Sequence, residues 1–277
     1  MRPNNIRQIG IVTRYELLKY LRGRRLLAIV LLTVIVSAIF LVVPPAIGSH
    51  YSKDPTEFVT NMLRFLSVLS ILSATFFGAD AIVSEFESKT GYFLFPNPIR
   101  KTTIFLGKFI ASALVSVGAI ALYYLIAVVS VQVIDGSVPA NTGLSFAYSL
   151  VYLLAILAVA YLFSAVMRSS VYSLILTFFT FFLILPIVSS VSELAKFKPW
   201  FSITFASGIA TDILKNPYPT DTMIATTAGR GPGVPTPGAL ISGAQYYPAV
   251  TVSLVVMAAY FIVAFLLAIV LARRREM

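Results

Sequence analysis

The chain has no cysteine and a single histidine, His50, among its 277 residues. Without thiols it forms neither a disulfide framework nor a thiolate metal site, and one histidine does not complete a zinc site. Charged residues make up only 12% of the sequence, whereas soluble domains carry roughly 25%. We therefore predict no metal site, and a protein class other than a soluble globular domain.

The low content of charged residues is matched by a high content of apolar residues. They make up 58% of the chain, whose mean hydropathy is +0.89. A helix that crosses a bilayer needs about 20 predominantly apolar residues. Six runs approach or exceed this length: 26–43, 62–83, 109–134, 146–167, 171–191 and 249–272. We predict an all-α, polytopic membrane protein that forms one domain over residues 1–277 and contacts membrane lipid.

The first apolar run has an alternative interpretation as the core of a cleaved signal peptide, because residues 46–48 are small enough for a cleavage site. However, 25 residues precede this run, and it is longer than the roughly 7–15 residues of a signal core. We expect a retained first span.

The distribution of Lys and Arg predicts the orientation in the membrane. A net charge of +10 in a soluble protein would suggest nucleic acid, but here the cations flank the apolar runs, where they set topology. Six spans place fifteen Lys and Arg on the side of the termini and six on the other. We predict cytoplasmic termini, no nucleic-acid partner, and a large extracytoplasmic loop at 192–248. The part of this loop at 226–245, rich in Gly, Pro, Thr and Ser, is expected to be irregular.

Residues 84–108, SEFESKTGYFLFPNPIRKTTIFLGK, interrupt the apolar sequence on the predicted cytoplasmic side. Gly91 tolerates the left-handed turn that ends many helices, and Pro96 and Pro98 bracket a turn. One interpretation is a solvated connector, and the other is a docking surface for a cytoplasmic partner. In both, the charged side chains are expected at the water boundary.

This segment resembles the region between the second and third spans of type-2 ABC exporter permeases. The shared pattern consists of Asp80, Glu85, Glu87, Thr90, Gly91, Leu94, Pro98, Arg100, Gly107 and Lys108. Residues 13–32 are similar to the interfacial helix of that family, and residues 162–176, with Ser164, Arg168 and Ser169, resemble its cytoplasmic hairpin.

The resemblance implies a permease of the plasma membrane that works with a second permease chain, identical or related, and two copies of an ABC ATPase. The substrate would pass between the permeases. Residues 1–25 would form an interfacial helix containing Arg14, Tyr15 and Glu16, and Arg168 and Ser169 would lie in a second cytoplasmic hairpin. The ATPase-coupling interface would comprise Glu85, Glu87, Lys89, Thr90, Gly91, Pro98, Arg100 and Lys101.

The chain has no nucleotide site of its own. A P-loop requires Gly, four residues, and then Gly-Lys-Ser/Thr, but residues 233–240 carry Ala239 and Leu240 at the last two positions. The chain is therefore not expected to be an enzyme or to bind a cofactor, and ATP and Mg are expected on the partner ATPase.

Two other function classes stay open from the residues alone. One is a helical membrane anchor or assembly protein without transport activity. The other is a secondary transporter, which would carry intramembrane charges or broken helices. Arg64, near the outer boundary of the second span, is expected to extend to the lipid headgroups, with an anionic substrate as the alternative contact. Lipids, peptides, drugs, saccharides and a role in metal handling are all open as the cargo.

The predicted topology is testable because the chain lacks cysteine. A Thr236→Cys variant should react with a membrane-impermeant maleimide added outside intact cells, and the parent chain should not react. Labelling of Thr236→Cys only after access to the cytoplasmic side would overturn the orientation.

Overall fold

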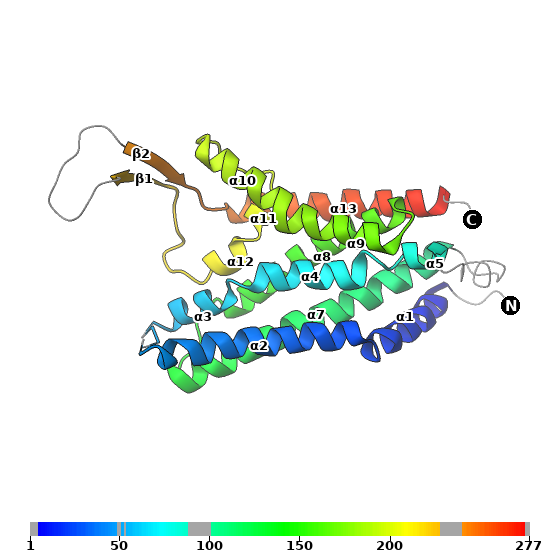
Figure 1. The fold of residues 1–277 in the computed structure, drawn as a ribbon, viewed down its shortest axis with the longest axis horizontal. Helices are drawn as coiled ribbons and strands as arrows, with labels where there is room; N and C mark the ends of the chain where they lie inside the picture. Colours follow the sequence, from blue (N-terminus) through cyan, green and yellow to red (C-terminus); the bar gives the residue numbers. More distant parts are fainter. Residues whose placement is uncertain (1–4, 49–50, 53, 88–100, 228–239, 275–277) are drawn as a thin grey trace.

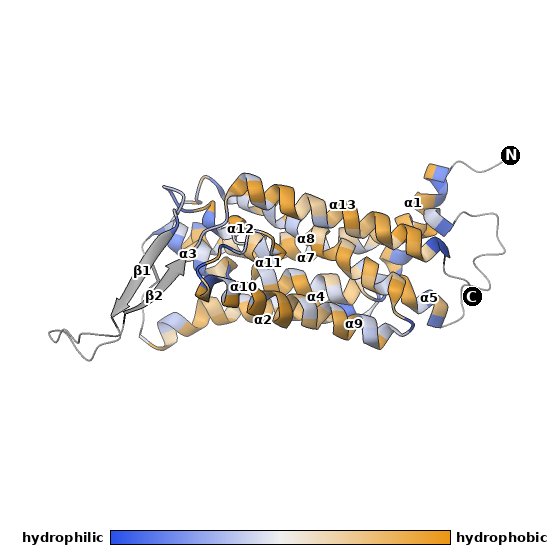
Figure 2. Ribbon diagram, turned by 90° about the horizontal axis from the view of Figure 1, so that it is seen from above, coloured by the Kyte–Doolittle hydropathy of each residue, from blue (hydrophilic) through white to orange (hydrophobic). Residues whose placement is uncertain are grey.

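The structure is a computed structural model, and it describes residues 5–48, 51–52, 54–87, 101–227 and 240–274. Long helices lie side by side along one axis (Figure 1). Both termini lie at one end of the bundle, and a β-hairpin projects from the other (Figure 1). Apolar residues dominate the middle of the long helices, and hydrophilic residues gather towards the ends (Figure 2).

The prediction of six spans is confirmed, because the described residues contain six helical segments long and apolar enough to cross a membrane. Four of these are α2 (Arg24–Ala46), α7 (Lys101–Ile134), α8 (Thr142–Val166) and α13 (Val250–Arg274). The prediction placed the start of the third span at residue 109, whereas α7 begins at Lys101. A separate helix, α1 (Asn5–Leu21), precedes α2, and its position at a membrane interface stays a prediction.

The second span is divided into three helices, α3 (Pro55–Leu63), α4 (Leu66–Gly78) and α5 (Val83–Glu87). The Asp54 side chain caps α3 by accepting a hydrogen bond from the Thr56 amide at 2.9 Å, as expected of an N-cap carboxylate. The break before α5 is stabilised from α8, where the Ser164 hydroxyl accepts hydrogen bonds from the Ile82 and Val83 amides. This helical segment starts at Pro55, which is earlier than the predicted residue 62.

The fifth span contains a π-helical turn. It consists of α9 (Ser170–Phe179), the π-turn η1 (Thr180–Ile184) and α10 (Leu185–Leu194). The Leu185 amide donates to the Thr180 carbonyl, five residues earlier. Pro186 follows directly, and because it has no amide hydrogen it cannot complete the usual α-helical ladder.

The loop between the fifth and sixth spans is more ordered than expected. Helices α11 (Ile203–Ala206) and α12 (Ile209–Asp212) bury Ile203 and Ile209 completely. Strands β1 (Thr222–Thr227) and β2 (Leu240–Gln245) pair antiparallel, with Thr222 opposite Gln245. The expectation of an irregular segment over 226–245 is thus wrong at both of its ends, and residues 228–239 lie outside the described residues.

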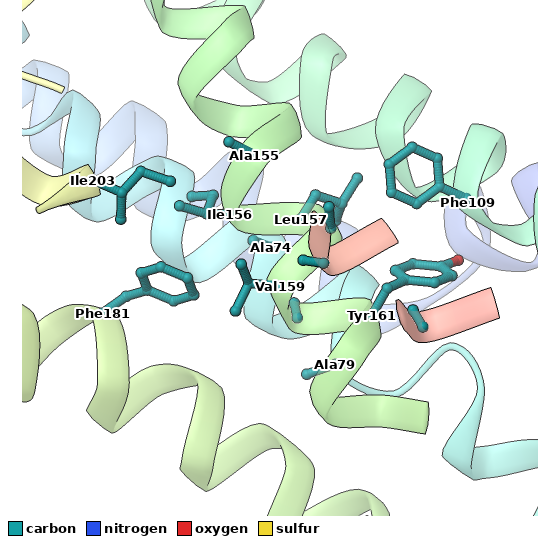
Figure 3. Packing of buried hydrophobic residues seen from close by; sticks show 14 of the residues in the cluster. Ala74, Ala79, Phe109, Ala155, Ile156, Leu157, Val159, Tyr161, Phe181 and Ile203 are labelled. Carbon is teal, nitrogen blue, oxygen red and sulfur yellow. The ribbon is translucent and has the colours of Figure 1, made fainter. Parts of the chain in front are cut away.

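Helix α8 runs through the centre of the main apolar core (Figure 3). Its Ile156 and Leu157 are fully buried, and Phe109 of α7 and Phe181 of η1 belong to the same cluster. Small residues on α8, including Ala155, let the neighbouring backbones approach closely, as is common in membrane helices. In contrast, only 17% of the residues in the apolar stretch of the first, fifth and sixth spans are buried.

The contact between α4 and α8 depends on Gly78. A Cβ atom at this position would lie 2.8 Å from Leu157 Cδ1 and 3.0 Å from Ala160 Cβ. Gly78→Val should lower the free energy of unfolding by about 1–3 kcal/mol, the usual cost of overpacking a core. Thermal unfolding of the purified protein in detergent measures this loss.

The matched control for that variant is Gly118→Val. A Cβ atom at Gly118 would meet nothing within 4 Å, so the unfolding temperature should stay near that of the parent. Equal behaviour of the two variants would contradict close packing at Gly78.

Candidate coupling site

A buried lysine joins three separate helices at the end of the bundle where the termini lie. The Lys108 ammonium of α7 lies 2.7 Å from Glu16 Oε1 of α1 and 2.6 Å from Glu85 Oε1 of α5. The Lys108 side chain is 1% exposed. Lys108, Glu16 and Glu85 are called the ionic cluster below.

Close packing of α1 against α7 makes this meeting possible. A Cβ atom at Gly107 would lie 2.8 Å from Cβ and Cγ1 of Val12, so glycine is needed where the two backbones cross. The Thr13 hydroxyl donates to the Gly107 carbonyl at 3.2 Å. Glu16, one turn further along α1, thereby reaches the Lys108 ammonium.

The electrostatics of the ionic cluster favour three charged groups that stay together. Moving an ammonium out of water carries a large desolvation cost, which close pairing with carboxylates offsets. Lys108 has two such partners on different helices. Loss of Lys108 would leave two carboxylates close together without the ammonium between them, so the cluster fixes the relative positions of α1, α5 and α7.

A layer of hydroxyl groups continues from the ionic cluster into the bundle. Ser112, one turn after Lys108, donates to the Phe77 carbonyl at 2.8 Å and lies 3.2 Å from the hydroxyls of Tyr20 and Tyr161. Burial raises the pKa of the Tyr20 hydroxyl, which keeps it neutral and able to donate to the Phe77 carbonyl at 3.3 Å. These bonds connect α1, α4, α7 and α8.

Two further contacts attach neighbouring elements to the same end of the bundle. The Arg25 guanidinium, at the start of α2, lies 2.6 Å from Asp80 Oδ2. Glu87 accepts hydrogen bonds from the Ser170 amide at 2.8 Å and from the Ser169 hydroxyl at 3.2 Å. A carboxylate at the first turn of α9 is favourable because the helix N-terminus carries partial positive charge.

The model of one known protein family, described as ABC-2 family transporter protein, matches residues 44–270 of the chain. The chain belongs to this family. It is therefore a transmembrane permease of an ABC transporter, and this membership favours that reading over a simple anchor or a secondary transporter. None of the curated proteins compared with the sequence matches it.

The ABC-2 permease brings together several of the residues predicted to couple it to an ATPase. Glu16 of α1 and Glu85 of the predicted interface meet on Lys108, and Glu87 meets Ser169 of the second hairpin. Their role in binding a partner stays a prediction. The expectation that Glu85 lies at the water boundary is wrong, because Glu85 is 7% exposed and paired.

Other predicted residues are described by their exposure. Arg14, Tyr15 and Arg168 are exposed, and Lys101 is partly buried at the start of α7. Predicted interface residues that lie outside the described residues are Lys89, Thr90, Gly91, Pro98 and Arg100.

Sequence reasoning missed the central role of Lys108. The charge was interpreted as a membrane-orienting cation at the end of a span that starts at residue 109. Its position beside Gly107, inside a helix that begins at Lys101, is the signal that could have revealed it. A lysine next to the glycine of a close helix crossing has little access to water.

We predict that Lys108→Met strongly destabilises the permease. It would leave Glu16 and Glu85 close together without Lys108 between them, and breaking a buried ion pair costs about 3–5 kcal/mol. A triple variant, Lys108→Met with Glu16→Gln and Glu85→Gln, removes all three charges and should recover at least half of that loss. Thermal unfolding in detergent compares the two, and a triple variant no more stable than Lys108→Met would contradict the electrostatic origin.

Proposed function

We propose that this permease forms, with a second permease chain, the path of an ATP-driven exporter. The observation that carries the proposal is the ionic cluster, which ties the helices on both sides of residues 88–100 to each other and to α1. A partner that moves this segment would move α1, α5 and α7 as one unit.

The proposed motor is a separate ABC ATPase, present in two copies that bind ATP and Mg. The permease sequence lacks the lysine and hydroxyl residue that a P-loop places on the phosphates and on magnesium. Cations such as Lys89 and Arg100 would pair with carboxylates of the ATPase, and such pairs direct association and orientation. ATP binding would close the two ATPases and push on the permease.

The proposed location is the plasma membrane, with both termini in the cytoplasm. The structure supports the second part of this proposal through the placement of the two ends at one side of the bundle (Figure 1). Arg273 and Arg274 end α13 there, and α1 carries Arg14 and Lys19 at the same side. Clusters of Lys and Arg next to spans favour the cytoplasm.

The proposed substrate path includes the exposed side of the fifth span. A cavity of about 410 Å³ lies between α4, α8, η1, α10 and α11. Its lining combines aromatic rings, such as Phe181 and Phe205, with the hydroxyls of Ser189 and Thr204 and the carboxylate of Glu193. This mixture suits a cargo with both apolar and polar parts. A second permease facing this side would complete the path.

The coupling role is tested with Lys89→Ala and Arg100→Ala combined. Glu85 is left unchanged because it is buried in the ionic cluster, where its loss would affect folding. On affinity purification, the double variant should retain about one tenth, or less, of the ATPase that the parent retains. A loss of about 1.4 kcal/mol of interface energy corresponds to a factor of ten. Quantitative mass spectrometry of the purified complex measures the ratio of the subunits.

The control is Arg273→Ala with Arg274→Ala, which removes two exposed cations from the same end of the bundle. This control should retain the ATPase like the parent. If the Lys89 and Arg100 variant also assembles like the parent, residues 88–100 are only a connector.

A further inference from the structure

A polar cavity of about 450 Å³ lies beside α3, at the end of the bundle opposite the ionic cluster. One wall comes from α3 and the residues that flank it, and the other from α12 and the segment that follows. The lining residues that carry charge are Asp54, Glu57, Arg64 and Lys215. The cavity thus presents two acidic and two basic groups to a ligand.

The charges are ordered along α3. Asp54 and Glu57 stand at the start of the helix and Arg64 directly follows its last residue. A rise of about 1.5 Å per residue separates Glu57 from Arg64 by roughly 10 Å along the axis. Thr60 and Asn61 lie between them in the lining. Because α3 is the outer part of the second span, Arg64, at its inner end, is the lining charge nearest the membrane interior.

Two lining groups have unused hydrogen-bonding capacity within the described residues. Thr60 is 8% exposed, and its Oγ1 is buried without a hydrogen-bond partner. Arg64 is exposed and forms no ion pair with a described residue. Lys215 differs, because its ammonium lies 2.8 Å from Asp212 and 5.5 Å from the centre of the Tyr247 ring. Because the Thr60 oxygen is buried, Arg64 is the free donor that a ligand in the cavity would reach.

An apolar crevice of about 150 Å³ lies next to this cavity and shares Asn61 with it. Phe40 and Pro44 of α2 and Phe58 and Met62 of α3 line the crevice. The outer side of α2 is largely exposed, so the crevice adjoins a surface that faces lipid in a membrane. A polar site beside an apolar one fits an amphipathic ligand.

We propose that this cavity binds the headgroup of a zwitterionic phospholipid in the leaflet opposite the chain termini. Arg64 holds the phosphate, because it is exposed in the lining and a guanidinium donates two parallel hydrogen bonds to an oxyanion. Asp54 and Glu57 face the ammonium. In such a lipid the phosphate is closer to the acyl chains than the ammonium is, which matches the charge order along α3.

The two carboxylates also define what the cavity rejects. An anionic phospholipid offers a phosphate to Arg64 but no ammonium to Asp54 and Glu57, so these carboxylates keep their hydrogen bonds from the Thr56 amide and the Ser52 hydroxyl but gain no cation. Discrimination by an unpaired charge is a common source of specificity. The cavity should therefore prefer phosphatidylethanolamine over phosphatidylglycerol with the same acyl chains.

The test is native mass spectrometry of the full chain released from nanodiscs containing equal amounts of these two lipids. The parent should retain phosphatidylethanolamine about threefold to fivefold more than phosphatidylglycerol, the factor expected for exposed charge pairs. Arg64→Gln and Glu57→Gln should each lower this ratio towards one. The control Lys196→Asn removes an exposed cation outside the cavity, keeps a residue suited to the positive φ of 59° at that position, and should retain the parent ratio.

A charge-swapped variant, Glu57→Arg with Arg64→Glu, keeps the net charge and reverses the order along α3. Loss of preference in this variant supports the proposal, whereas retention of the preference overturns it. Equal retention of both lipids by the parent also overturns it. If soluble phosphoethanolamine displaces the lipid at equal concentration, the ligand is a free zwitterion, and the assignment to a lipid is wrong. None of these measurements involves the ATPase, so they are independent of the proposed export function.

Discussion

The ammonium of Lys108 is the charge on which the end of the bundle near the termini depends. It is almost fully removed from solvent, and its partners come from two different helices that precede α7 in the sequence. Loss of the ammonium would leave the two carboxylates close together in a place where water does not compensate. This requirement makes α1 part of the folded bundle, although α1 contributes few apolar residues to the core.

The bundle around the ionic cluster is closely packed at its centre, and its peripheral helices are mostly exposed. Helix α8 occupies the middle and is mostly buried, whereas the first, fifth and sixth spans expose most of their apolar surface. Exposed apolar faces on a membrane helix are satisfied by lipid or by another protein. The arrangement leaves the surface of the fifth and sixth spans available for the second permease that the proposed exporter requires.

The hydropathy of the sequence was sufficient to predict the number of spans and the all-α class, because each span must supply apolar residues whatever it packs against. Helix ends were predicted less well where polar residues continue a helix. Residues 101–108 were interpreted as loop and edge, yet they form the first two turns of α7. Likewise, the break near residue 80 depends on a hydroxyl from Ser164, about 80 residues away, and no local pattern could have shown it.

The coupling site was predictable in its residues but not in its connections. Glu16 and Glu85 were both singled out from a resemblance, but they lie 92 and 23 residues from Lys108 in the sequence. A spacing rule relates only residues on one helix. Only the fold shows that these charges meet, and that Glu85 is therefore a poor choice for a surface contact.

The π-turn in the fifth span controls which side of that helix faces the bundle. Ser173, Thr177, Phe181 and Ser189 are its buried positions, and they recur at multiples of four residues, more than the 3.6 of a regular helix. A wider turn takes up the additional residue, so that α9 and α10 present one continuous stripe inwards. If the same residues formed a regular α-helix instead, α10 would be rotated by about 100° about its own axis relative to α9. Such a change would turn Glu193 and the hydroxyls of α10 away from the cavity, so the lining of the cavity depends on the π-turn as well as on the composition of this segment.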